Sequence, residues 1–154
     1  MRQIIDKLIL NNKTISTMES CTGGGLANEI TSCEDASQVL KFSAVTYSNE
    51  YKIKMGVKEE IINKYTVYSI ETAHSMASSI SNFTNSNFGV GITGKLNKVD
   101  LDNPYGEDNV VFVSIYDKDN NIYHDLEIKV DKSSRKENKI VVINKIIDKL
   151  HEIL

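Results

Sequence analysis

Strand-like and helix-like segments alternate along the whole chain, and this alternation constrains the fold more than any other feature of the sequence. Thr14–Met18 is rich in β-branched residues and predicts a buried strand, which is followed by a helical pattern at Leu26–Thr31. Strands separated by helices predict an α/β fold in three layers, α/β/α. Helices cover both faces of a mixed, mostly parallel sheet of about five strands.

The remaining segments follow the same rules of periodicity, capping and turn chemistry. Before the first strand we predict a helix with Ile4, Ile5, Leu8 and Ile9 on one face, and after the second helical pattern a strand at Val39–Tyr47 and helices that start at Ser48–Glu50 and span Glu59–Tyr65. A helix capped by Ser69 continues through Ala73, Met76, Ala77 and Ile80, and a strand follows at Phe88–Thr93. The chain then forms a hairpin of Val110–Tyr116 and Ile122–Val130 around Asp117–Asn121, and a last helix from Ser133 or Ser134 with Ile140, Ile143, Ile147, Leu150 and Leu154 on its face.

Length and composition narrow the class of protein. The 154 residues suffice for a single domain over 1–154, and a net charge of -3 argues against nucleic acid as the main partner. Two cysteines match neither a disulfide framework nor a zinc signature, so we expect no metal site. No apolar run reaches the ~20 residues that span a bilayer. We therefore expect a cytoplasmic protein with no membrane partner.

Polar and glycine-rich segments follow three of the predicted strands. They are Ser20–Gly25, Tyr47–Lys52 and Thr93–Gly94. In an open α/β sheet, ligands bind outside the carboxyl ends of the strands. The three segments therefore predict the site.

The first segment, Ser20-Cys21-Thr22-Gly23-Gly24-Gly25, joins a strand to a helix. Glycines permit a tight turn, and N–H groups at a helix start stabilise either a phosphate or a developing oxyanion. The segment is neither a Walker loop nor a dinucleotide fingerprint. On its own it could equally be a structural turn capped by Ser20 or Thr22.

A serine nucleophile needs a base, and none of His74, His124 and His151 falls at a strand end. Lysine can act as the base where burial or a neighbouring positive charge lowers its pKa. Tyr47 and Lys52 lie one strand-to-helix turn apart, so both could point into one crevice. The alternative is a solvated lysine and a core tyrosine.

Glu19-Ser20-Cys21-Thr22-Gly23-Gly24 and Thr46-Tyr47-Ser48-Asn49-Glu50-Tyr51-Lys52 together resemble the two hallmark motifs of the CinA C-terminal domain family. That family includes stand-alone nicotinamide-nucleotide amidases. The similarity continues in order through Met55-Gly56-Val57, Thr93-Gly94, Pro104-Tyr105-Gly106 and Arg135. It covers nearly the whole chain.

The resemblance implies hydrolysis of nicotinamide mononucleotide to nicotinate mononucleotide and ammonia, without a cofactor. Ser20 would be the nucleophile, Lys52 the general base, and Tyr47 a hydrogen-bonding assistant to either. Backbone N–H groups near Gly23 and Gly24 would stabilise the oxyanion. Thr22, Thr93 with Gly94, and Arg135 would hold the substrate, and Arg135 suits a phosphate. A solvated Arg135 among Lys132, Lys136 and Lys139 is the alternative. The family also suggests a homodimer or a larger assembly.

The sequence departs from the family pattern after Gly94. The family usually carries a glycine-rich stretch there, whereas this chain has Lys95 to Asn103, and Asp131–Arg135 also replaces the usual Gly-Asp-Arg. Side chains fill space that glycines leave open. Two alternatives follow: an amidase of the same design with another carboxamide substrate, or a non-catalytic domain that binds nucleotides.

Overall fold

The computed structural model of the chain describes residues 1–97, 101 and 103–154. The strands in these residues form one sheet of five, in the order β2-β1-β3-β4-β5. Their bounds are β1 (Ile15–Glu19), β2 (Leu40–Val45), β3 (Phe88–Gly94), β4 (Val110–Asp117) and β5 (Ile122–Lys129).

The strand directions confirm the predicted mixed sheet. β1 pairs in parallel with both β2 and β3, whereas β4 pairs antiparallel with β3 and with β5. Within the described residues β4 alone therefore runs against the other strands. The carboxyl ends of β2, β1 and β3 meet at one end of the sheet.

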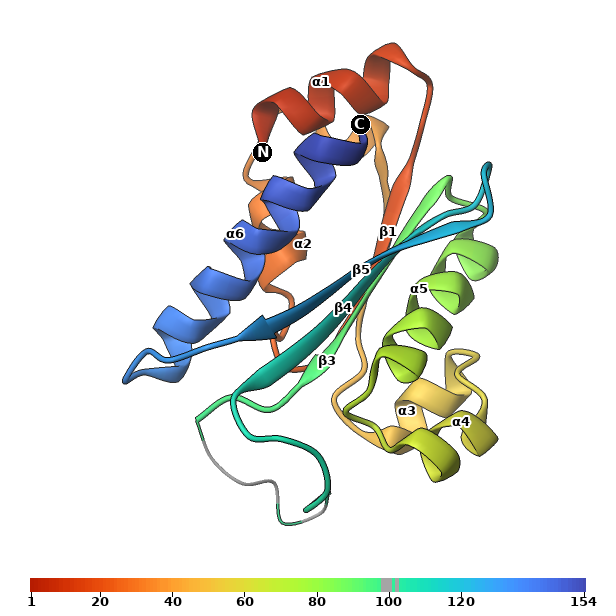
Figure 1. Cartoon of the computed structure of the whole chain (residues 1–154). Coiled ribbons are helices and arrows are strands. Elements are labelled where there is room, and N and C mark those ends of the chain that lie inside the picture. The colour runs from red at the N-terminus through yellow and green to blue at the C-terminus, as the bar shows by residue number, and fades with distance from the viewer. Residues whose placement is uncertain (98–100, 102) are drawn as a thin grey trace.

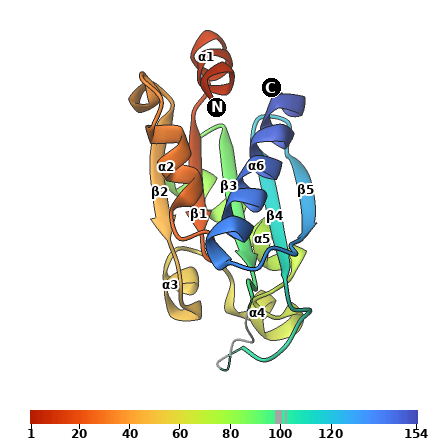
Figure 2. The ribbon, with the colours of Figure 1, turned by 90° about the vertical axis from the view of Figure 1, so that its left-hand side faces the viewer.

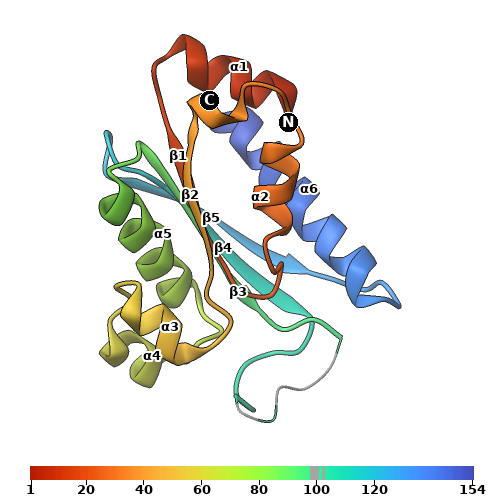
Figure 3. The same ribbon diagram turned by 180° about the vertical axis from the view of Figure 1, so that it is seen from behind.

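Helices cover both faces of the sheet, which confirms the three layers (Figure 1). One layer holds α1 (Arg2–Leu10), α2 (Gly25–Thr31) and α6 (Arg135–Ile153), and the other holds α3 (Asn49–Lys54), α4 (Glu59–Tyr65) and α5 (Ile70–Thr84). Seen with the sheet face-on, α6 runs in front of β3 and β4 while α5 lies behind them (Figure 2). The first turn of α6 lies at the end of the sheet where β2, β1 and β3 finish, away from both termini (Figure 3).

The core has two parts because the sheet separates the helices. The larger part packs the sheet against α1, α2 and α6, and the smaller joins Met18, Val57, Met76 and Ile80 on the α5 face. The predicted face of the last helix needs correction. Its buried apolar residues are Val142, Ile143, Ile146 and Leu150, while Ile140 is 49% exposed.

Most boundaries match the predictions, and the exceptions have local causes. β2 ends at Val45 rather than Tyr47, and Ser48 caps α3 by accepting from the N–H of Tyr51. Ser69 caps α5 as predicted, accepting from the N–H of Thr72 at 3.2 Å. A short 3₁₀ helix, η1 (Ala36–Gln38), was not predicted.

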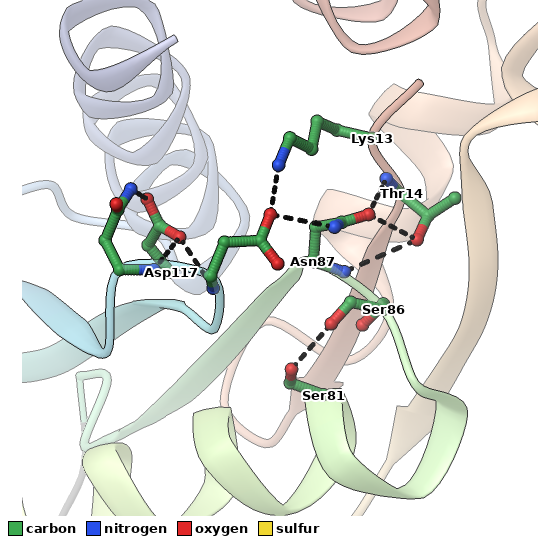
Figure 4. Close-up of polar contacts among 8 residues, drawn as sticks. Lys13, Thr14, Ser81, Ser86, Asn87 and Asp117 are labelled. Atoms are coloured by element: carbon green, nitrogen blue, oxygen red, sulfur yellow. Dashed lines mark hydrogen bonds and ion pairs between the residues drawn. The ribbon is translucent and has the colours of Figure 1, made fainter. Parts of the chain in front are cut away.

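A polar cluster ties the strands together at the amino end of β1 and β3 (Figure 4). Asn87 Oδ1 accepts from the N–H of Thr14 at 2.9 Å, and Asn87 Nδ2 donates to Asp119 at 2.9 Å. Lys13 pairs with the same Asp119 carboxylate, in the turn between β4 and β5. These side chains have partners within the fold, so we assign the cluster to structure.

Candidate active site

Ser20 and Lys52 come together at the carboxyl ends of β1 and β2. Ser20 follows the last residue of β1, and Lys52 lies on α3, which starts just after β2. Lys52 Nζ donates to Ser20 Oγ at 3.1 Å and to the carbonyl oxygen of Thr46 at 2.8 Å. The lysine is only 1% exposed and the serine 7%. The solvated lysine that the sequence left open is therefore not what the structure contains.

A buried carboxylate holds the turn that carries Ser20. Glu19 Oε1 accepts from the N–H of Ala27 at 2.9 Å, and Oε2 accepts from the N–H of Leu26 at 3.2 Å and from Thr22 Oγ1 at 2.7 Å. The N-cap of α2 is Gly24, which has no side chain to accept hydrogen bonds from the first turn of the helix. Glu19 accepts them instead. Glu19 belongs to the first sequence motif, but its role in holding this turn was not predicted.

The two glycines after Thr22 have left-handed backbones. Gly23 has φ 63° and Gly24 has φ 89°, conformations that a side chain disfavours. The N–H of Gly23 donates to the carbonyl of Ser20 at 3.0 Å and so closes the turn. An oxyanion role for N–H groups near Gly23 and Gly24 stays a prediction.

Cys21, beside the candidate nucleophile, is not a competing one. Its side chain is 2% exposed, and burial raises the pKa of the thiol to about 12 against the opposing effects of Arg135, Lys52 and Lys139. The thiolate is the reactive form of cysteine, so this thiol is inert at neutral pH.

Positive side chains from α6 approach the glycine turn. A Cβ placed on Gly23 would lie 3.1 Å from Lys139 Nζ, and Arg135 precedes Lys139 by one helical turn. Arg135 Nη1 donates to the carbonyl of Leu96 at 2.7 Å. From the sequence, Lys139 was expected only to be one of several charges around Arg135, and no role in the site was predicted for it. The i, i+4 spacing from Arg135 was the signal that could have placed it on the same helix face.

Tyr47 lies at the rim of this group rather than in the core. Its side chain is 66% exposed, and its hydroxyl accepts from Arg135 Nη2 at 3.0 Å. The structure therefore connects Tyr47 to the predicted phosphate ligand. A hydrogen bond from Tyr47 to Ser20 or Lys52 stays a prediction.

The two threonines predicted to hold substrate make internal contacts. Thr22 donates to Glu19, and Thr93 Oγ1 donates to the carbonyl of Val67 at 2.8 Å. Gly94 packs against β4, where an added Cβ would lie 2.5 Å from the carbonyl oxygen of Val110. All three residues lie at the predicted strand ends, and their contacts with a substrate stay predictions.

Lys95 is the first residue of the stretch that stands where the family usually has a glycine-rich one, and its side chain has a structural role. Its side chain is 1% exposed, donates to the carbonyl of Gly106 at 3.3 Å and lies over the ring of Tyr68. Lys95 thus fastens the segment around Gly106 to the sheet end. Of the predicted stretch Lys95 to Asn103, residues 98–100 and 102 lie outside the described residues.

A hollow of about 390 Å³ opens at α4 and the loop before α5. Polar and aromatic residues make up most of its lining, together with two aliphatic ones: Asn49, Ile62, Asn63, Thr66, Val67, Tyr68, Asn103 and Tyr105. Asn49 Nδ2 donates to Asn103 Oδ1 at 3.0 Å across it. Asn49 begins the helix that carries Lys52, so this hollow lies next to the site.

Other potential functional groups lie apart from Ser20. His74 pairs with Asp125 at 2.7 Å and stacks on Tyr123, on the outer part of α5 and β5. Within residues 1–97, 101 and 103–154, no group of three His, Cys, Asp or Glu side chains is placed to hold a metal ion. No helix in the same residues is long and apolar enough to cross a membrane.

Comparison with known proteins gives the same family that the motifs indicated. A family model described as the CinA C-terminal domain matches residues 1–154. A CinA-like protein from Flavobacterium psychrophilum is 39% identical over 116 residues, which are 73% of this chain and 27% of that protein. A putative competence-damage inducible protein from Clostridium botulinum is 44% identical over 92 residues, 59% of this chain and 22% of that protein. The chain thus spans about a quarter of the length of these curated relatives.

Solved structures share the fold. The competence/damage inducible protein CihA from Agrobacterium tumefaciens has a TM-score of 0.85 at 26% identity, over 97% of this chain and 92% of that one. A CinA superfamily protein from Escherichia coli has a TM-score of 0.89 at 20% identity, over 99% and 87%. At 20% identity the second likeness concerns the fold alone.

Proposed function

Because the chain belongs to the CinA C-terminal domain family, we propose that it is a serine amidohydrolase. Its substrate in this proposal is nicotinamide mononucleotide, which it converts to nicotinate mononucleotide and ammonia. The observation that carries the proposal is the 3.1 Å contact between Lys52 Nζ and Ser20 Oγ. A hydroxyl is a weak nucleophile, and a base at hydrogen-bond distance is what activates it.

The reaction follows from this pair. Lys52, as the neutral amine, takes the Ser20 proton while Ser20 Oγ attacks the carboxamide carbon. Lys52 then returns the proton to the nitrogen, which leaves as ammonia and leaves an acyl-serine. Water then attacks the acyl carbon while the same amine takes its proton, and Lys52 passes that proton to Ser20 Oγ as the carbon–oxygen bond breaks and nicotinate mononucleotide leaves. Burial supports this assignment, since removal from water disfavours a charged ammonium.

The cations of α6 support a phosphate-bearing substrate. Arg135 and Lys139 lie beside the glycine turn, and guanidinium geometry matches a phosphate. In this proposal Arg135 binds the phosphate, Lys139 adds a second positive charge, and Tyr47 orients the guanidinium through its 3.0 Å contact. Thr22, Thr93 and Gly94 shape the site around the pyridine nucleotide. We place this reaction in the cytoplasm, in keeping with two unpaired cysteines.

An ammonia-release assay with purified protein tests the proposal. We expect release from nicotinamide mononucleotide, and a loss of about a thousandfold in Ser20→Ala and in Lys52→Met, as general-base catalysis typically contributes 10²–10⁴-fold. Lys54→Met is the matched control, because Lys54 lies on the same helix with its side chain 57% exposed. Activity unchanged by Ser20→Ala would contradict the mechanism.

Lys95 favours a second candidate, an amidase of the same design with another carboxamide substrate. Its buried side chain begins the stretch that stands where the family usually has a glycine-rich one, and it lies over the ring of Tyr68, which lines the polar hollow. A panel of pyridine nucleotides and other carboxamides distinguishes the two. Trapping an acyl group on Ser20 by mass spectrometry, with no turnover of nicotinamide mononucleotide, would favour the second candidate.

A non-catalytic nucleotide-binding domain makes a different prediction in the same experiments. Calorimetry would show saturable binding while no substrate in the panel released ammonia. Turnover well above the Ser20→Ala background would rule this alternative out.

A further inference from the structure

The hydroxyl of Thr46 is a buried polar group without a partner, and it lies in the proposed active site. Among the described residues, two side-chain oxygens are buried and make no hydrogen bond, Thr46 Oγ1 and Ser114 Oγ. Thr46 is 2% exposed. Leaving such a group unsatisfied costs stability, so its presence beside a reactive serine calls for a reason.

The backbone of Thr46 fixes its place next to Ser20 and Lys52. Its N–H donates to the carbonyl of Glu19 at 2.8 Å, which continues the pairing of β2 with β1. Its carbonyl accepts from Lys52 Nζ at 2.8 Å, while the same nitrogen reaches Ser20 Oγ. The hydroxyl therefore belongs to a residue that already holds the lysine.

Strand alternation indicates that the Thr46 and Ser20 side chains share one face of the sheet. Met18 and Ala44, two residues earlier on each strand, both pack in the small core cluster on the α5 face. Successive side chains alternate between faces, so Ser20 and Thr46 follow Met18 and Ala44 to the same side. Lys52 approaches from α3, which lies on the α5 side of the sheet, at the end where β2 finishes (Figure 1).

We propose that Thr46 is a positioning residue whose hydroxyl accepts a hydrogen bond from Lys52 after the lysine has taken the Ser20 proton. This rests on the proposed function. When the Ser20 O–H bond breaks, its electron pair forms the bond to the carboxamide carbon, and the proton becomes an additional N–H on Lys52. An ammonium only donates, and the Thr46 hydroxyl can accept. In the resting site the hydroxyl makes no hydrogen bond with Lys52, and a rotation of the Thr46 side chain brings its oxygen to the new N–H of the ammonium.

Thr46→Val tests the proposal, because valine keeps the shape and removes the oxygen. We expect kcat for ammonia release to fall about tenfold or more, the order that a hydrogen bond to a charged group contributes. The acidic limb of the kcat/KM profile should also move to lower pH, because the ammonium loses a stabilising contact. The melting temperature should be equal or higher. Thr46→Ser keeps the hydroxyl, so its kcat and the pH position of its acidic limb should both equal those of wild type.

Ser114→Ala is the matched control, since it removes the other unpartnered hydroxyl. Ser114 lies within β4 opposite Gly91, away from the strand ends that carry the site. It should leave the pH profile unchanged. A Thr46→Val profile equal to wild type in height and position would overturn the proposal, as would a Thr46→Ser enzyme as slow as Thr46→Val.

A second readout separates this proposal from the choice of substrate. The rate at which a fluorophosphonate labels Ser20 depends on proton removal from the hydroxyl and on no particular amide. Slower labelling in Thr46→Val than in Thr46→Ser supports the role of the hydroxyl even if nicotinamide mononucleotide is not turned over. Equal labelling rates in these two variants and in wild type overturn it.

Discussion

At the scale of single residues, neighbouring side chains in the site have opposite chemical roles. Ser20 lies beside an amine, whereas the adjacent Cys21 points into the main core, where burial raises the pKa of its thiol to about 12. Strand alternation alone separates them, because consecutive side chains leave the strand end in different directions. The buried Cys21 thiol therefore does not compete with the Ser20 hydroxyl, which is the nucleophile in the proposed function.

Cys21 leads to a pH prediction. The pKa of the folded thiol, about 12, exceeds its ordinary value of 9.0, so above pH 9.0 the unfolded chain releases a proton that the folded chain retains. The free energy of unfolding is therefore unaffected by the titration of this thiol below pH 9.0. Above pH 9.0 it decreases by ~1.4 kcal/mol per pH unit as the pH rises toward the pKa of the folded thiol. Urea unfolding at several pH values above 9 should show that the free energy of unfolding decreases less with rising pH in Cys21→Ala than in wild type. Parallel curves for the two proteins would contradict the prediction.

At the scale of elements, β3 can hold α5 closely because the two residues that face the helix, Gly89 and Gly91, lack side chains. A Cβ added at Gly91 would lie 2.3 Å from the carbonyl oxygen of Ala73 and 2.6 Å from the N–H nitrogen of Ala77, and Gly89 is equally crowded. Close contact of α5 with β3 fixes Val67 and the loop before α5, where Thr93 bonds. The distance between helix and sheet therefore affects the end of β3 that reaches the site.

Gly91→Ala should destabilise the fold strongly. The added methyl meets helix backbone, which moves only if α5 moves, and overpacking of this kind costs about 3 kcal/mol. Gly25→Ala is the matched control, because its Cβ would meet the end of the flexible Ile143 side chain at 2.6 Å. Denaturant unfolding should show a change within about 1 kcal/mol for Gly25→Ala. Similar losses in both variants would contradict this assignment.

At the scale of the whole molecule, a protein of net charge -3 concentrates positive charge at one end of its sheet. Lys52, Arg135 and Lys139 all act on the Cys21 thiol, although they come from distant parts of the chain. We expect a local positive cluster of this kind to bind small anions rather than nucleic acid, which stays a prediction. The homodimer or larger assembly expected from the family stays a prediction.

This charge distribution predicts how substrate binding responds to mutation and salt. Arg135→Gln and Lys139→Gln should each raise KM for nicotinamide mononucleotide about tenfold, with a smaller change in kcat, because each removes a charge-assisted contact to phosphate. Salt should raise the wild-type KM as screening increases. Lys136→Gln is the control, since Lys136 is exposed on the same helix. An equal KM for Lys136→Gln and Lys139→Gln would contradict a role for Lys139.

Much of the fold and part of the site could be predicted from local sequence. The strand at β1, the caps at Ser48 and Ser69, and the β4–β5 hairpin depend on neighbouring residues and were predicted. The buried face of α6 was predicted only in part. Ile143 and Leu150 are buried as predicted, but Ile140 and Val142 are equally apolar and only the position of the sheet decides which of the two is covered. Tyr47 was placed beside Lys52 by spacing, yet its hydroxyl bonds to Arg135, 88 residues away.

By itself the sequence determined the three-layer architecture, the family and the pair Ser20 and Lys52. Periodicity, caps and short motifs are local, and parallel strands bring their carboxyl ends together whatever the side chains are. Only the tertiary structure decided that Lys52 is buried, that Glu19 holds the α2 turn, and that the Thr46 hydroxyl lacks a partner. Burial and hydrogen-bond satisfaction depend on which distant segments pack together, and no local pattern records that packing.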